Sequence, residues 1–154
     1  MPHIHDKIDF TVEVFIIHNN KVLLRRHDKY KMWLGVGGHI ELDEDPVQAG
    51  VRECKEEVGL DVVIVGNNLQ FDDIENKELI PPLFMNRHWI NKTHEHVTFV
   101  YVATSKTDDV REGSAHEHSS SIKWFTATEL DDPSYALMGN IVHYAKKALE
   151  FTRV

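Results

Sequence analysis

The chain has 154 residues, a formal charge of −8 and 42% hydrophobic residues, a composition typical of a folded globular protein. This length predicts a single domain over residues 1–154. No apolar run approaches the roughly 18 residues that cross a bilayer, and no secretory signal is visible. We therefore expect a cytoplasmic protein with no membrane partner. The single cysteine, Cys54, excludes an intrachain disulfide, and the negative charge disfavours a nucleic acid polymer as partner.

The apolar pattern predicts strands along most of the chain. Alternation predicts a first strand over residues 9–17, and Asn19-Asn20 predicts a hairpin turn into residues 22–24. A glycine-rich segment, residues 35–38, then precedes a helix. Further strands are predicted over residues 62–65, 83–90, 97–103 and 122–125, and a closing helix over residues 134–149. This order predicts an α/β fold with a mixed sheet.

The helix after the glycines has clear start and stop signals. Asp45 can cap its first turn, Pro46 suits the first helical position, and Gln48 can complete a capping box. Gly59 can end it. At about 100° per residue, four apolar residues fall on one stripe that we expect to pack on the sheet: Val47, Val51, Cys54 and Val58.

Three carboxylates, from Glu53, Glu56 and Glu57, fall within an arc of roughly 100° on the other side of this helix. Such a run is commonly only a solvated helix face. Here Glu53 and Glu57 repel each other one turn apart, and the helix dipole disfavours anions in the last turn. Each effect costs from a few tenths to about 1 kcal/mol. The arrangement therefore predicts a bound cation, and Mg²⁺ prefers such oxygen ligands.

Arg52 lies one turn from Glu56 and can also reach back to Glu44. Its predicted role is to orient carboxylates rather than to grip a substrate. A basic cluster just upstream could meet a compact anionic substrate, or could be a solvated hairpin flank: Arg25, Arg26, Lys29 and Lys31. His39, next to the glycine pair, is a further candidate for contact with a ligand.

Seven residues carry a resemblance to a known family: Gly38, Glu44, Arg52, Glu53, Glu56, Glu57 and Gly59. They occupy the fixed positions of the Nudix box with its spacing, so residues 38–60 resemble the catalytic motif of Nudix hydrolases. The resemblance implies the Nudix fold, a mixed β-sheet sandwiched between helices with a loop-helix-loop motif. It also implies hydrolysis of a diphosphate bond in a nucleoside diphosphate linked to another moiety, using Mg²⁺ or Mn²⁺.

The resemblance also implies roles for individual residues. Glu53, Glu56 and Glu57 match the family's metal ligands, and Glu44 with Arg52 matches its supporting pair. The carbonyl of Gly37 is a possible further ligand. The chain departs from the usual pattern at Val36, where many members have proline, and at Cys54, where Leu, Ile or Val is usual. Neither change removes a reacting group.

The general base is left open by the motif. Glu53 is one candidate, and in this family a Glu from a distant loop can take the role. The long polar loop over residues 104–121 supplies Glu112 and Glu117, with Glu95 a weaker choice. The expected partner is a small nucleoside diphosphate derivative whose identity the sequence does not reveal, and a homodimer is compatible with this interpretation.

Histidines occur in three pairs two residues apart, at His3/His5, His94/His96 and His116/His118. This spacing puts both rings on one face of an extended segment. Such pairs could hold Zn²⁺, but a Zn²⁺ site needs three or four ligands, and the sequence does not reveal which residues would complete it.

Two other functions compete with hydrolysis. A nucleotide sensor on the same fold would bind without cleaving, but a sensor has no need of an intact carboxylate set. The isopentenyl diphosphate isomerase branch uses a catalytic cysteine, whereas Cys54 falls on the apolar stripe of the helix.

Overall fold

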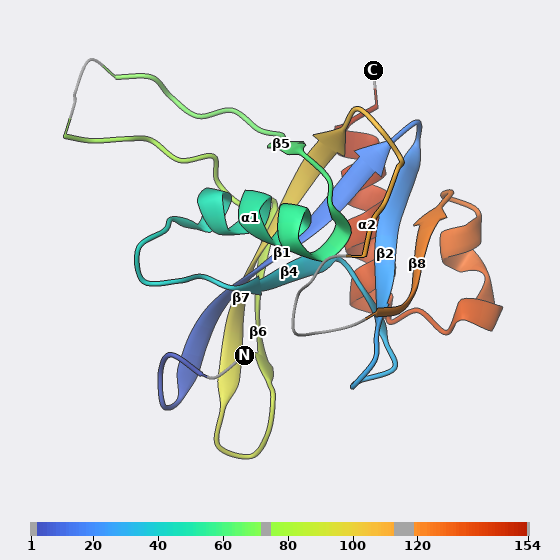
Figure 1. The fold of residues 1–154 in the computed structure, drawn as a ribbon, viewed down its shortest axis with the longest axis horizontal. Helices are drawn as coiled ribbons and strands as arrows, with labels where there is room; N and C mark the ends of the chain where they lie inside the picture. Colours follow the sequence, from blue (N-terminus) through green and yellow to red (C-terminus); the bar gives the residue numbers. More distant parts are fainter. Residues whose placement is uncertain (1–2, 72–74, 113–118, 154) are drawn as a thin grey trace.

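The computed structural model describes residues 3–71, 75–112 and 119–153 (Figure 1). Its strands are β1 (Ile8–His18), β2 (Lys21–His27), β3 (Trp33–Leu34), β4 (Val36–His39), β5 (Val62–Ile64), β6 (Phe84–Trp89), β7 (Glu95–Ser105) and β8 (Ser119–Phe125). Its helical elements are α1 (Pro46–Val58), two short 3₁₀ turns, η1 (Glu129–Asp131) and η2 (Pro133–Tyr135), and α2 (Gly139–Phe151). Within the described residues, no helix is long and apolar enough to cross a membrane.

The strands form one mixed sheet with the central order β3-β2-β1-β7-β5. β1 and β7 run parallel over most of their length, and the other pairings are antiparallel. β4 pairs with β1, β6 with β7, and β8 with β2. The predicted α/β class with a mixed sheet is confirmed.

The two helices pack on opposite faces of this sheet. Because side chains alternate along a strand, Val14 and Ile16 of β1 join the core cluster beneath α1, whereas Phe15 and Ile17 join the cluster beneath α2. Figure 1 shows α1 in front of the sheet and α2 behind it. The sheet is therefore sandwiched between helices, as the family resemblance implied.

Most of the glycine-rich segment, for which the sequence predicted no element, forms a strand. Val36–His39 is the strand β4, and Gly37 and Gly38 pair with Glu13 and Val12 of β1. The predicted hairpin turn is confirmed, since Asn19 and Asn20 have φ values of 47° and 60°. The glycines are thus held by the central strand, directly beside α1.

The closing helix begins later than predicted, so the expected range of residues 134–149 is wrong at its start. Pro133–Tyr135 forms the 3₁₀ turn η2, and Ala136 adopts a left-handed conformation with φ 52°. A left-handed residue cannot continue an α-helix. The helix α2 therefore starts only at Gly139 and runs to Phe151.

The buried face of α1 also differs from the predicted stripe. Val51 is 38% exposed, whereas Glu53 and Glu57 are only 5% and 7% exposed. The prediction placed all three carboxylates on the side of the helix opposite the apolar stripe, from helical geometry alone. That placement holds only for Glu56, since Glu53 and Glu57 have arginine partners that make their burial tolerable. Cys54 is fully buried, as predicted.

Candidate active site

Helix α1 has the capping geometry that its sequence predicts. The Asp45 side chain accepts a hydrogen bond from the Gln48 backbone, and the Gln48 side chain accepts one from the Asp45 backbone. Gly59 ends the helix with φ 71°. These caps fix where the helix begins and ends in the chain. They therefore also fix the directions in which the helical side chains of the Nudix box point.

Glycines in α1 and β4 allow the helix to lie so close to the strand that the Glu53 carboxylate contacts the main chain of β4. A Cβ atom on Gly50 would lie 3.1 Å from the Val14 side chain, so the helix approaches the sheet closely. A Cβ atom on Gly38 would collide with the Glu53 carboxylate, and one on Gly37 would collide with the backbone of Val12. Gly38 is therefore required for the approach of Glu53 to the strand, and Gly37 for the close pairing of β4 with β1.

Glu57 is held from two sides. Its Oε1 accepts a hydrogen bond from Nη2 of Arg25 at 3.0 Å, and its Oε2 accepts one from the backbone N–H of Gly37 at 3.3 Å. The side chains of Arg25 and Glu57 are only 4% and 5% exposed. Sequence analysis offered Arg25 as a substrate contact. The structure instead turns it inward to a carboxylate, while Lys29 and Lys31 of the basic cluster remain exposed.

Arg52 donates hydrogen bonds to three other carboxylates, those of Glu44, Glu53 and Glu56. Its Nε and Nη2 donate to the two oxygens of Glu44 at 2.9 and 2.6 Å, and its Nη1 donates to Glu53 at 3.0 Å and Glu56 at 3.1 Å. Nη2 also donates to the carbonyl of His39 at 3.0 Å. A planar guanidinium can serve these acceptors together because its donors are fixed in a fork. This is the orienting geometry predicted for Arg52.

Charge and burial shift the pKa values of this group. Burial raises the pKa of Glu53, although the Arg52 guanidinium opposes the shift. Burial would also raise the pKa of Glu44, but the hydrogen bonds from Arg52 and the Glu41 backbone lower it overall. The pKa of Arg52 is raised, chiefly by its hydrogen bond to Glu44. Glu44 and Arg52 are thus a firmly ionised pair beside a carboxyl that is easier to protonate.

Glu13 is a carboxylate beside the site that sequence analysis did not single out. Its Oε1 accepts a hydrogen bond from the Gly35 backbone at 2.8 Å, and burial raises its pKa to about 6, opposed by that bond and by the charge of Arg25. An available signal was its place between Val12 and Val14 in the central strand, because a charged residue there is costly without a partner.

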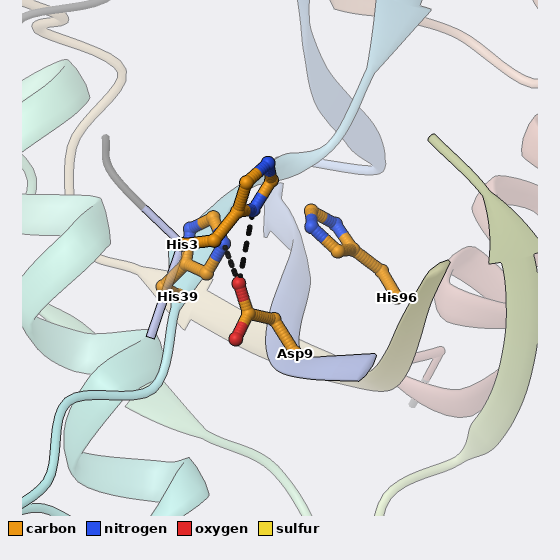
Figure 2. A group of neighbouring side chains, drawn as sticks. All are labelled: His3, Asp9, His39 and His96. Carbon is orange, nitrogen blue, oxygen red and sulfur yellow. Dashed lines mark hydrogen bonds and ion pairs between the residues drawn. The ribbon is translucent and has the colours of Figure 1, made fainter. Parts of the chain in front are cut away.

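His39 turns its ring away from the glutamates. Its Nε2 lies 3.1 Å from Oδ2 of Asp9, next to His3 and His96 (Figure 2). We call these four residues the histidine cluster. The cluster takes one member from each of two predicted histidine pairs, His3 and His96, and leaves out the exposed His5. The third pair, His116/His118, lies outside the described residues.

The candidate general bases lie in different surroundings in the structure. Glu112 is exposed and follows Arg111, whose backbone N–H donates to the carbonyl of Val58 at 2.9 Å, at the C-terminal end of α1. Glu117 lies outside the described residues. Glu95 is engaged elsewhere, since its two oxygens accept hydrogen bonds from Arg87 at 2.6 and 2.8 Å. Of the two loop candidates, Glu112 is therefore the one for which the structure describes a position near the helix.

A family model described as the NUDIX domain matches residues 8–145. The chain belongs to the NUDIX family. A solved structure of a NUDIX-family hydrolase from Clostridium perfringens is similar, with 33% identity and a TM-score of 0.82 over 94% of this chain and 98% of that one. The predicted family and fold are confirmed.

Two curated relatives match part of the chain. The Danio rerio protein named m7GpppN-mRNA hydrolase NUDT17 is 34% identical over 100 residues, covering 58% of this chain and 30% of the relative. The Haemophilus influenzae dihydroneopterin triphosphate diphosphatase is 39% identical over 85 residues, covering 54% of this chain and 53% of the relative. The matches thus span from about a third to about half of the length of these relatives.

Cys54 bears on the isomerase alternative. It is fully buried, and burial raises the pKa of its thiol well above the ordinary value, with the charges of Glu57 and Glu53 adding to the shift. A thiol that is both enclosed and hard to ionise is a poor nucleophile and a poor proton donor. The structure therefore disfavours the cysteine chemistry of the isomerase branch.

Proposed function

We propose that this chain is a metal-dependent pyrophosphohydrolase in which water attacks phosphorus and cleaves a diphosphate bond of a nucleoside diphosphate derivative. The supporting observation is the joining of Glu53 and Glu56 through one guanidinium nitrogen of Arg52, with Glu57 held beside Gly37. Membership of the NUDIX family and the hydrolase names of its relatives support the same reaction.

The chemistry of this donor set fits Mg²⁺. Glu53, Glu56 and Glu57 offer only carboxylate oxygens, and the backbone carbonyl of Gly37 would add a fourth oxygen donor, which suits a hard cation. Arg25 and Arg52 already pair with these carboxylates, so their charge is only partly balanced by protein. When bound, the metal would neutralise phosphate charge and lower the pKa of a coordinated water. Mn²⁺ would serve the same donors.

The remaining residues act by positioning and proton transfer. Glu44 fixes Arg52 through two hydrogen bonds, and Arg52 in turn fixes the rotamers of Glu53 and Glu56. The proton of the attacking water goes to a carboxylate, for which Glu53, Glu112 and Glu117 are the candidates. Burial raises the pKa of Glu53, which makes its carboxylate a better proton acceptor, and Glu112 lies on the loop beside the end of α1.

A substrate screen tests this function. Purified protein in Mg²⁺ is incubated with nucleoside diphosphate sugars, dinucleoside polyphosphates and nucleoside triphosphates, and phosphate is measured after coupling to a phosphatase. The names of the relatives add a pteridine triphosphate and a short capped RNA, and the latter tests the expectation that no nucleic acid polymer is a partner. If the protein bound a nucleotide but released no product from any of these substrates, the alternative function as a nucleotide sensor would be favoured.

The proposal includes a single domain over residues 1–154 that works in the cytoplasm on a small molecule. Fractionation of cells that express the tagged chain tests the location. Size-exclusion chromatography with light scattering tests whether the chain forms a homodimer.

A further inference from the structure

The histidine cluster is built from four places along the chain: the N-terminal segment and the strands β1, β4 and β7 (Figure 2). We propose that this cluster is a binding site for a divalent transition-metal ion, with Zn²⁺ as its best fit. The site is distinct from the glutamates of the box, and the inference does not rest on the proposed hydrolysis.

Strand register explains why these residues meet. Asp9 of β1 pairs with His96 of the parallel strand β7, and Thr11 of β1 pairs with His39 of β4. Paired residues share a face of the sheet, and so do residues two apart on one strand. The strand register therefore places Asp9, His39 and His96 on one face of the sheet. The N-terminal segment folds back to add His3, whose Nδ1 lies 3.1 Å from Oδ2 of Asp9.

Asp9 is oriented as a metal-binding carboxylate would be. The residue is fully buried, and its Oδ1 accepts hydrogen bonds from the backbone N–H groups of Ile4 at 3.2 Å and His5 at 2.7 Å. Its Oδ2 faces the imidazoles (Figure 2). Outer hydrogen bonds of this kind fix the ligands of metal sites. Here the backbone of the N-terminal segment supplies them.

Unpartnered ring nitrogens give an independent indication of a ligand. His94 is 3% exposed, and its Nδ1 donates to the carbonyl of Asp6 at 3.2 Å. Its Nε2 lies 3.3 Å from Oδ2 of Asp9 and has no hydrogen-bond partner among the described residues. The Nε2 atom of His96 is buried and has no hydrogen-bond partner among the described residues. A cation bound by the histidine cluster would satisfy this Nε2 atom of His96.

The spacing of the donors fits a compact ion. The four ligand atoms of the cluster lie within 4.8 Å of one another. Tetrahedral Zn²⁺ with bonds of about 2.0–2.1 Å needs ligand atoms about 3.3 Å apart, so modest side-chain rotations suffice. Three imidazoles and one carboxylate match the preference of Zn²⁺ for nitrogen donors, whereas Mg²⁺ prefers oxygen.

The two sites are joined through one residue. The ring of His39 belongs to the cluster, while its backbone carbonyl accepts a hydrogen bond from Arg52. An ion bound to the cluster would also tie the N-terminal segment to three strands. Metal binding should therefore stabilise the fold by preferential binding to the native state.

The test is Zn²⁺ affinity of the untagged full chain, measured by competition with a chromophoric chelator in millimolar Mg²⁺, which occupies oxygen ligands. We expect one tight Zn²⁺ per chain and a tetrahedral visible spectrum with Co²⁺. The variants His96→Ala and His3→Ala should each weaken Zn²⁺ binding by about 100-fold or more, since even outer partners of ligands contribute 10–100-fold. His3 lies in an exposed segment, so its removal leaves the core intact.

Matched controls separate the sites. His5→Ala removes the other, exposed histidine of the same pair and should bind Zn²⁺ as the parent does. Glu56→Gln should also keep the tight Zn²⁺ site and the Co²⁺ spectrum. The inference is overturned if the parent binds no Zn²⁺ tightly in Mg²⁺. It is equally overturned if His96→Ala and His3→Ala bind like His5→Ala, or if Glu56→Gln alone abolishes the tight site.

Discussion

Arg25 of β2 and Glu57 of α1 form a buried ion pair, with Nη2 of the arginine 3.0 Å from Oε1 of the glutamate and both side chains almost fully enclosed. Removing one partner of such a pair leaves an uncompensated buried charge, whereas replacing both with apolar residues does not. The pair therefore links the stability of the fold to the shape of the candidate active site.

The variant Arg25→Met should lower the free energy of unfolding by about 3–5 kcal/mol. The double variant Arg25→Met/Glu57→Leu should recover much of that loss. Urea denaturation in a chelating buffer measures both, with Arg87→Met as a control in an exposed ion pair. A double variant no more stable than Arg25→Met would contradict the pairing.

Arg52→Lys tests the orienting role of the guanidinium. Lysine cannot serve Glu44, Glu53 and Glu56 at once, so the carboxylates lose their fixed positions. We expect the Mg²⁺ concentration for half-maximal activity to rise by about 10–100-fold, as for other outer-shell changes. Activity at saturating Mg²⁺ should fall less. An unchanged Mg²⁺ curve, like that expected of the control Arg87→Lys, would show that Arg52 does not position the ligands.

Glu13 should make stability fall with rising pH. Its folded pKa of about 6 exceeds its ordinary value of 4.5, so the folded state binds more protons between these values. Stability is then highest below pH 4.5 and declines by up to about 2 kcal/mol as pH rises through 6. Glu13→Gln keeps the acceptor for Gly35 and should remove this decline.

Urea melts at pH 4 and pH 7 measure the effect, with the exposed Glu150→Gln as the control. The Glu13→Gln variant should exceed the parent in stability at pH 7 and match it more closely at pH 4. Equal stability of variant and parent at both values would show that Glu13 ionises normally in the folded protein.

The general base is tested by three matched Glu→Gln changes, at Glu53, Glu112 and Glu117. Loss of the base should lower kcat by about 10²–10⁴ with little change in KM, because a base acts in the transition state. Loss of a metal ligand should instead raise the Mg²⁺ requirement. Sequence position favours Glu117, which is closer to Ile122 in the next strand, whereas the structure describes Glu112 beside the end of α1. Two unaffected loop variants beside an inactive Glu53→Gln would place the base on α1.

Much of the site could be predicted because its signals are local. Asp45, Gln48 and Gly59 set the helix by short-range hydrogen bonds, and the spacing of the glutamates then follows from helical geometry. The burial of Glu57 could not be predicted, because its partner Arg25 is brought close only by the fold. The burial of Glu53 depends on the approach of α1 to Gly38 of β4, which is equally a product of the fold. The apolar periodicity of α1 therefore predicted the wrong buried face, because it placed Val51 inside and these two glutamates outside.

The histidine cluster was beyond sequence analysis for a related reason. His39 and His96 are far from His3 and Asp9 in the chain, and they meet only through the parallel register of β1 with β7 and the pairing of β4. β4 itself lies in a glycine-rich segment that gives no apolar alternation. The left-handed Ala136 likewise carries no residue-type signal, which is why the start of α2 was misplaced.

The central claim is that the glutamates of α1 carry metal-dependent hydrolysis, and Glu56→Gln tests it most directly. Glu56 is 53% exposed, so its replacement should leave the melting temperature of the chelated protein unchanged. With the best substrate of the screen, we measure kcat against Mg²⁺ for the parent, Glu56→Gln and the equally exposed helix control Glu150→Gln. The account predicts that only Glu56→Gln loses most activity. Hydrolysis by Glu56→Gln at the parent rate would contradict it.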